Sequence, residues 1–118
     1  MYYHRRNKYW NQKAIVDWIT FDSVKEATFY KQLKILEKAD KIKNLELQPV
    51  YILQDSFKYK WKTIRAIKYI ADFSYIDIDK NTQVIIDVKW YKNEVYNLKK
   101  KLFLKKIAEH KDVIFKEI

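Results

Sequence analysis

The sequence predicts a mixed α/β fold within one domain, and three observations support this fold class. The chain has 118 residues, a length typical of a single domain. Apolar residues make up 48% of the chain, which is enough to form a hydrophobic core. Two segments show apolar residues at helical spacing, whereas the others are rich in residues typical of strands. We therefore expect a basic N-terminal arm over residues 1–12 and one domain over residues 13–118.

The first elements are a short β element and a helix. Residues 14–20 are rich in β-forming residues and predict a strand or a hairpin. A helix over about residues 23–40 begins at Asp22 or Ser23, because Ser23 and Glu26 fit the Ser-x-x-Glu capping box. The apolar stripe of this helix is expected to consist of Phe29, Tyr30, Leu33 and Leu36.

The remaining elements are strands on both sides of a second helix. Pro49 separates two extended pieces within residues 45–53, because proline cannot donate to a central ladder. A basic loop, FKYKWK, follows. We then expect, in order, strands over residues 63–77 and 83–90, a helix over residues 93–110 and a strand over residues 112–118. The core-facing stripe of the second helix is expected to consist of Val95, Leu98, Leu102 and Ile107.

Composition excludes several classes of function. Without glycine the chain has no Walker-type phosphate loop, no dinucleotide fingerprint and no nucleophile elbow, and without cysteine it has no thiolate site. Its two histidines, His4 and His110, lack ligand-spaced partners. No apolar run approaches the roughly 20 residues of a membrane span, and the N-terminus does not resemble a signal peptide. We expect a cytoplasmic protein without membrane contact, whose chemistry rests on carboxylates, lysines and a bound metal.

The charge of the chain favours a polyanionic partner. Lys and Arg total 25 against 15 Asp and Glu, a formal net charge of +10. Basic residues interleaved with aromatic ones are typical of nucleic-acid binding, because Lys and Arg neutralise phosphates. The alternative is an ordinary solvated surface in a protein from an AT-rich genome. The residues expected to bind nucleic acid are Arg5, Arg6, Lys58, Tyr59, Lys60, Trp61, Lys62, Arg65, Lys99, Lys100 and Lys101.

Two aspartates occupy unusual positions in predicted strands. Asp72 interrupts the most apolar stretch of its strand, and Asp87 interrupts VIIDV. If the hairpin turns at Asp79–Lys80, the numbers of paired residues sum to 159, and Asp72 faces Asp87 with Cβ atoms about 5 Å apart. A divalent cation between the two carboxylates removes their repulsion. The alternatives are an ordinary edge-strand aspartate at Asp72 and a same-face salt bridge between Asp87 and Lys89.

Glu26 lies at the centre of the apolar stripe of the first helix, about 20° from Leu33 on a helical wheel. An unpaired carboxylate that faces a core is costly. Glu26 therefore either completes the capping box with Ser23 or belongs to a site.

These residues resemble the PD-(D/E)XK nuclease superfamily, in which a helix glutamate, an aspartate and a D-x-K triplet follow one another as Glu26, Asp72 and Asp87 to Lys89 do here. More specifically, four blocks and the lysine-rich helix after them resemble a small family of phage and prophage proteins labelled Holliday-junction-resolvase-like or of unknown function. The blocks are FDSVKEA (21–27), LELQP (45–49), YIADFSYI (69–76) and IIDVK (85–89). The chain is also similar to the endonuclease subunit of some transposons, which shares the helix glutamate and the Gln-Pro pair.

The resemblance covers about residues 10–118 and implies a restriction-endonuclease-like core in the order αβββαβ, a central mixed sheet flanked by helices, with a short N-terminal β element. It implies that Glu26, Asp72, Asp87 and the carbonyl of Val88 bind Mg²⁺ or Mn²⁺, whose hard character suits oxygen ligands. Lys89 would position the attacking water and stabilise developing charge. Gln48 would help to orient the site, or is a plain polar residue at a strand end.

We therefore expect a Mg²⁺- or Mn²⁺-dependent endodeoxyribonuclease from a phage or mobile element. It would cut branched DNA or nick duplex DNA as a homodimer. The alternative is a catalytically inert module on the same fold that binds nucleic acid or protein, such as a phage inhibitor of host defence; Trp90 after the motif lysine motivates it. A third hypothesis is a basic protein that coats nucleic acid regardless of metal and branching.

Overall fold

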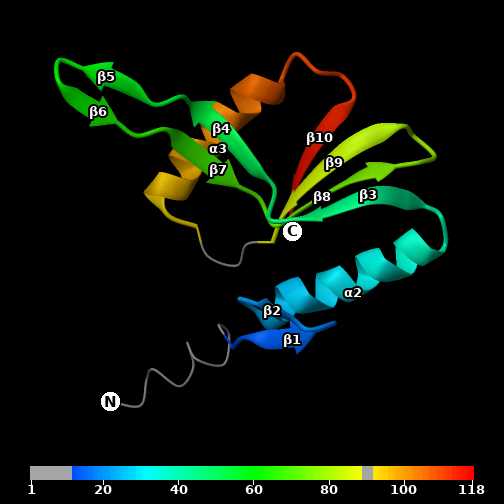
Figure 1. The fold of residues 1–118 in the computed structure, drawn as a ribbon. Coiled ribbons are helices and arrows are strands. Elements are labelled where there is room, and N and C mark those ends of the chain that lie inside the picture. The colour runs from blue at the N-terminus through cyan, green and yellow to red at the C-terminus, as the bar shows by residue number, and fades with distance from the viewer. Residues whose placement is uncertain (1–11, 89–91) are drawn as a thin grey trace, which may run out of the picture. The chain divides into compact units, whose positions relative to one another are not determined.

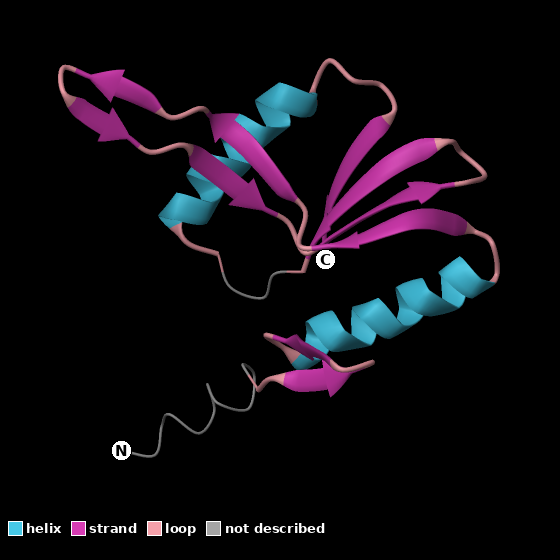
Figure 2. Ribbon diagram, viewed as in Figure 1, coloured by secondary structure: helices cyan, strands magenta, loops and turns pink. Residues whose placement is uncertain are grey.

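The computed structural model describes residues 12–88 and 92–118. Within these residues the chain is a mixed α+β protein with two helices and ten strands (Figure 1 and Figure 2), and neither helix is long and apolar enough to cross a membrane. The backbone divides into two compact units, the first ending at Ile42 and the second beginning at Lys43. The single domain over residues 13–118 stays a prediction, and residues 1–11 of the predicted arm lie outside the described residues.

The first unit begins with an antiparallel hairpin of β1 (Ala14–Val16) and β2 (Ile19–Phe21). Its two-residue turn consists of Asp17 and Trp18, whose φ angles are 53° and 67°. Two successive left-handed residues are typical of the type I′ turn, which matches the twist of the flanking strands. The hairpin predicted within residues 14–20 is therefore confirmed, although its turn contains no glycine.

The helix of the first unit, α2 (Val24–Lys38), begins at Ser23 as the sequence predicts. The Ser23 hydroxyl accepts a hydrogen bond of 3.1 Å from the backbone N–H of Glu26, which satisfies one of the free amides at the helix start. Asp40 follows the helix with a left-handed φ of 57°, which ends it without a glycine. The buried residues of α2 are Glu26, Ala27, Tyr30 and Leu33. Leu36 is exposed, so its predicted place in the buried stripe is wrong.

A mixed four-stranded sheet forms the centre of the second unit. Its strand order is β10-β9-β8-β3, with β3 (Ile42–Leu47) at the edge and starting at the boundary between the units. β8 (Phe73–Asp77) pairs antiparallel with β9 (Thr82–Asp87). β10 (Val113–Glu117) pairs parallel with β9. A parallel neighbour needs a crossover connection, and α3 (Glu94–Ile107) provides it.

A narrow two-stranded ribbon leaves this sheet between β3 and β8. β4 (Val50–Gln54) pairs with β7 (Ile67–Ile70), and β5 (Phe57–Tyr59) pairs with β6 (Lys62–Ile64) to form the distal hairpin (Figure 1). Two predictions are therefore wrong: residues 63–77 are not one strand but end β6 and form β7 and β8, and the basic FKYKWK segment is a hairpin and not a loop.

Both strands of the ribbon bend at the same level, which explains why residues 63–77 do not run straight. The backbone N–H of Ala71 donates to the Pro49 carbonyl at 3.2 Å, and the N–H of Gln48 donates to the Asp72 carbonyl at 2.9 Å. Pro49 has no N–H to continue the ladder of the main sheet, so its strand departs there and the neighbouring strand departs with it.

The core of the second unit lies between α3, the ribbon and the sheet. Tyr69, Ala71, Ile85 and Phe103 are buried there, and the rings of Tyr69 and Phe103 lie 4.8 Å apart. Further side chains packed against this cluster are those of Tyr51, Leu53, Tyr96, Ile107, Val113 and Phe115.

The predicted core face of α3 is wrong in three of its four residues. Val95, Leu98 and Leu102 are exposed, whereas Tyr96, Phe103 and Ile107 pack inward. The buried stripe is rotated because α3 packs against the aromatic side chains of the ribbon, where the rings of Phe103 and Tyr96 bury more area than leucine or valine.

Candidate metal and nucleic-acid site

The register of the β8–β9 hairpin is the one that the sequence predicts. Its pairs run from Asp77↔Thr82 to Phe73↔Ile86, so the numbers of paired residues sum to 159 throughout. Beyond the last pair, the Asp72 N–H donates to the Ile86 carbonyl at 3.0 Å. The numbers of these two residues sum to 158, so the register shifts by one residue at Asp72, and the predicted pair of Asp72 and Asp87 is not among the pairs of this hairpin.

The side chain of each aspartate accepts a hydrogen bond that orients it. Asp87 is 0% exposed, and its Oδ2 accepts a short hydrogen bond from the Tyr69 hydroxyl. Asp72 Oδ2 accepts a hydrogen bond of 2.6 Å from the backbone N–H of Val88. Burial, the hydrogen bond to Asp87 and the charge of Asp87 together raise the pKa of Tyr69 strongly, so its hydroxyl remains a donor at any ordinary pH.

A third carboxylate, that of Glu117, lies beside Asp87 and is not among the site residues predicted from the sequence. Glu117 is the parallel partner of Asp87 in the register of β9 and β10. Its carboxylate accepts hydrogen bonds from the Tyr96 hydroxyl at 2.5 Å, from Lys100 Nζ at 2.6 Å and from Lys92 Nζ at 3.3 Å. The available signal was weak: Glu117 shares a strand face with Val113 and Phe115, where an acid is out of place.

The ionisation of Glu117 is determined by these partners. Burial alone would raise the pKa of Glu117, but the hydrogen bonds from Lys100, Tyr96 and Lys92 outweigh it and lower the value to about 2. The charged carboxylate of Glu117 thus connects β10 to α3. Lys100, which is predicted to bind nucleic acid, forms a salt bridge with Glu117.

Gln48 adjoins Asp72 through its main chain. Its N–H donates to the Asp72 carbonyl, and its φ of 51° lies in the left-handed region. The structure therefore brings together four of the predicted site residues, Gln48, Asp72, Asp87 and Val88.

Two further predicted catalytic residues, Glu26 and Lys89, are not part of this described group. Glu26 belongs to the first unit, where it is buried and its backbone is capped by Ser23. Lys89, Arg5 and Arg6 lie outside the described residues, as does Trp90.

The donor chemistry at the ends of β8 and β9 fits a hard divalent cation. No group of three or more His, Cys, Asp or Glu side chains in residues 12–88 and 92–118 is arranged to hold a metal ion. Two carboxylates and the neighbouring Val88 carbonyl nevertheless offer only oxygen donors, which Mg²⁺ and Mn²⁺ prefer. The hydrogen bonds from Tyr69 and Val88 are of the kind that orients metal ligands.

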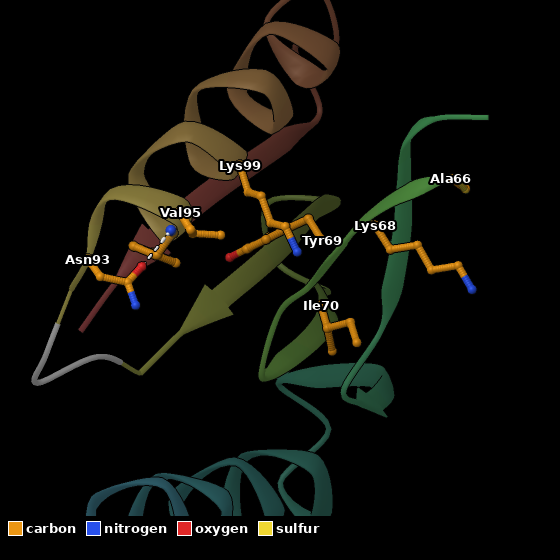
Figure 3. A pocket seen from close by; sticks show the side chains of 8 residues that line it. Ala66, Lys68, Tyr69, Ile70, Asn93, Val95 and Lys99 are labelled. Atoms are coloured by element: carbon orange, nitrogen blue, oxygen red, sulfur yellow. Dashed lines mark hydrogen bonds between the residues drawn. The ribbon is translucent and has the colours of Figure 1, made fainter. Parts of the chain in front are cut away.

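An open pocket of about 490 Å³ lies between β7 and the start of α3 (Figure 3). It is lined by Ala66, Lys68, Tyr69, Ile70, Asn93, Val95, Tyr96 and Lys99. Lys68 and Lys99 give its wall positive charge. Tyr69 lines this pocket and also donates a hydrogen bond to Asp87, so the pocket adjoins the candidate site.

The predicted nucleic-acid contacts of the second unit fall on two elements. Lys58, Tyr59, Lys60, Trp61 and Lys62 are exposed residues of the β5–β6 hairpin, which Arg65 follows. Lys99, Lys100 and Lys101 lie on α3, where Lys101 is exposed.

A family model described as "Protein of unknown function (DUF1064)" matches residues 6–117. The chain belongs to this family. The DUF1064 match covers the described residues of both units up to Glu117 and includes every candidate site residue except Arg5. No curated protein and no solved structure matches the chain. Because the description of DUF1064 assigns no activity, the function proposed below rests on the residues of the site.

Proposed function

We propose that this chain is a Mg²⁺- or Mn²⁺-dependent DNA endonuclease that acts in the cytoplasm of a cell hosting a phage or mobile element. It would cut branched DNA, or nick duplex DNA, by attack of water on a phosphodiester. The observation that carries the proposal is that Asp72 hydrogen-bonds to Ile86 and Val88, the two neighbours of Asp87, and Lys89 follows Asp87 by two residues in the sequence.

The order of the elements supports the same proposal. From α2 onward, the strands of the main sheet and the helices follow as α2, β3, β8, β9, α3 and β10. We interpret this order as the αβββαβ of a restriction-endonuclease-like core, with β4 to β7 as an insertion between its first two strands. The parallel pairing of β10 with β9 after a crossover helix agrees with that arrangement.

The residues of the site have separable roles in this proposal. Asp72, Asp87 and the Val88 carbonyl would hold the cation, and Glu26 stays a predicted ligand. A bound Mg²⁺ or Mn²⁺ supplies Lewis acidity and lowers the pKa of bound water. Tyr69 and the Val88 N–H hold the two carboxylates in place. Lys89 would position the water and stabilise negative charge, and Gln48 would brace the backbone at Asp72.

The decisive experiment compares cleavage by Asp87→Ala, Asp87→Asn and Asp72→Asn with the wild-type chain. Substrates are a four-way junction, nicked duplex, linear duplex and single strand, each with Mn²⁺, Mg²⁺ or EDTA. We expect metal-dependent cleavage that falls at least about a hundredfold in each variant, since even the partners of metal ligands contribute about 10- to 100-fold. DNA binding should remain near normal or become tighter.

The matched control is Asp79→Asn, because Asp79 is an exposed aspartate in the turn at the opposite end of the same hairpin. It should cleave like the wild type. Full activity of the Asp87 variants would overturn the assignment.

A catalytically inert module on the same fold, binding nucleic acid or protein, is the second candidate. The full burial of Asp87 and its engagement by Tyr69 favour it, because a buried carboxylate held by a hydroxyl also serves a purely structural role. Titration calorimetry separates the two functions: heat of Mg²⁺ or Mn²⁺ binding that Asp87→Asn abolishes supports the nuclease, and its absence supports the inert module.

A further inference from the structure

The β5–β6 hairpin is exposed on both of its faces. All six residues of its two strands are exposed. The pairs Phe57↔Ile64 and Tyr59↔Lys62 put two aromatic rings on one face. Trp61, in the turn between the strands, is 86% exposed. Such a concentration of apolar area in water is typical of a binding surface.

The charge around these rings selects an anionic partner. Residues 56–71 contain five basic residues and no acidic one. Within KYKWK the basic and aromatic residues alternate, and Lys60 Nζ lies 5.4 Å from the centre of the Tyr59 ring. Lys60 also has a left-handed φ of 58° in the turn, which places a cation at the tip beside Trp61.

A partner for this surface must offer flat π faces and negative charge at similar spacing. A nucleic acid strand with unpaired bases has both, because its bases stack on aromatic side chains while its phosphates contact Lys and Arg. In a duplex the base faces are covered by their neighbours. An anionic membrane surface offers charge but no π faces, and the lysine at the tip of the hairpin is poorly suited to enter its apolar interior.

We propose that the β5–β6 hairpin binds unpaired bases of the nucleic acid on which the chain acts. Tyr59 and Trp61 stack on bases, and Lys58, Lys60 and Lys62 contact the flanking phosphates. The inference rests on the proposed function, and it narrows the substrate to DNA that contains a single-stranded or unpaired segment.

The test measures binding in EDTA, so that it is independent of cleavage. Fluorescence anisotropy gives the affinity of each variant for a labelled oligothymidylate and for a duplex of equal length. We expect Trp61→Ala and Tyr59→Ala each to weaken single-strand binding about tenfold and duplex binding less than about twofold. Trp61→Phe and Tyr59→Phe, which keep a ring, should restore most of the affinity.

The matched control is Trp18→Ala. Trp18 is 97% exposed in the turn of the β1–β2 hairpin, but its neighbour in that turn is Asp17 rather than a lysine. Its replacement should leave single-strand binding unchanged. Circular dichroism of each variant checks that the fold is intact.

Two results would overturn the inference. One is single-strand binding by Trp61→Ala and Tyr59→Ala that equals the wild type, or falls no more than their duplex binding. The other is Trp61-dependent binding to anionic phospholipid vesicles with no binding to the oligonucleotide. Neither result affects the cleavage test on Asp87, so the two proposals fail separately.

Discussion

The interaction between Tyr69 and Asp87 shows how a single residue supports the candidate site. A fully buried carboxylate is costly unless hydrogen bonds replace its lost hydration. Tyr69 provides one such hydrogen bond from β7 while its ring packs 4.8 Å from Phe103 and 6.3 Å from Phe115. The same side chain therefore contributes to the core and to the orientation of Asp87.

Replacing Tyr69 with Phe separates these two contributions. Because the ring is kept and the hydroxyl is lost, we expect Tyr69→Phe to lower the free energy of unfolding by about 1–3 kcal/mol. Urea denaturation measures the change. Tyr59→Phe is the control, since Tyr59 is an exposed tyrosine and its hydroxyl should contribute less than about 0.5 kcal/mol. Equal stability of Tyr69→Phe and wild type would contradict the role assigned to the hydrogen bond.

Glu117 connects two elements, because it lies on β10 and accepts hydrogen bonds from Tyr96 and Lys100 of α3. In the folded state the pKa of this carboxyl group is about 2, whereas its ordinary pKa is 4.5. A carboxyl group with a lowered pKa stabilises the fold above its ordinary pKa, and this contribution is lost as the pH falls toward the lowered value.

The variant Glu117→Gln tests this connection. Above pH 4.5 we expect it to be less stable than the wild type by at most about 3 kcal/mol, at about 1.4 kcal/mol per pKa unit. The difference should shrink between pH 4.5 and 2, where wild-type Glu117 takes up its proton. Chemical denaturation at a series of pH values measures it. Glu37→Gln, which breaks only the surface pair with Lys34, should show little effect. A difference that does not change with pH would contradict the lowered pKa.

At the scale of the whole molecule, α3 presents an exposed apolar surface that could form the interface of the expected homodimer. Val95, Leu98 and Leu102 form an exposed apolar stripe on α3, because the core takes up the opposite residues of the helix. A nuclease that resolves a junction makes two symmetric cuts, and a twofold pair of subunits supplies both sites. A second copy of the chain would cover the stripe.

Sedimentation velocity, with and without DNA, tests the dimer. We expect a dimeric mass for the wild type and a monomeric mass for Leu98→Glu, because a buried charge on the stripe would oppose association. Asn97→Glu introduces the same charge at the adjacent exposed position and should remain dimeric. A monomeric wild type at working concentration, also with DNA, would contradict the prediction.

Much of the local structure was predictable because neighbouring residues determine it. Ser23 capped α2, Pro49 separated β3 from β4, and the polar turn around Asp79–Lys80 set the β8–β9 register. The predicted register brought Asp72 and Asp87 to the same end of this hairpin. In each case the decisive interaction joins residues that are close in the chain.

Only the tertiary structure decided the features that depend on distant residues. The buried face of α3 depends on aromatic rings from the ribbon, the bends around Ala71 depend on Pro49, and the partners of Asp87 come from β7 and β10. Periodicity locates an apolar face only when all candidate residues bury similar area, and Phe103 and Tyr96 bury more than the leucines and the valine that the pattern favoured. The sequence by itself therefore determined the two helices and the β8–β9 hairpin register, whereas packing between elements decided the division of residues 57–77 into short strands and the surroundings of Asp87.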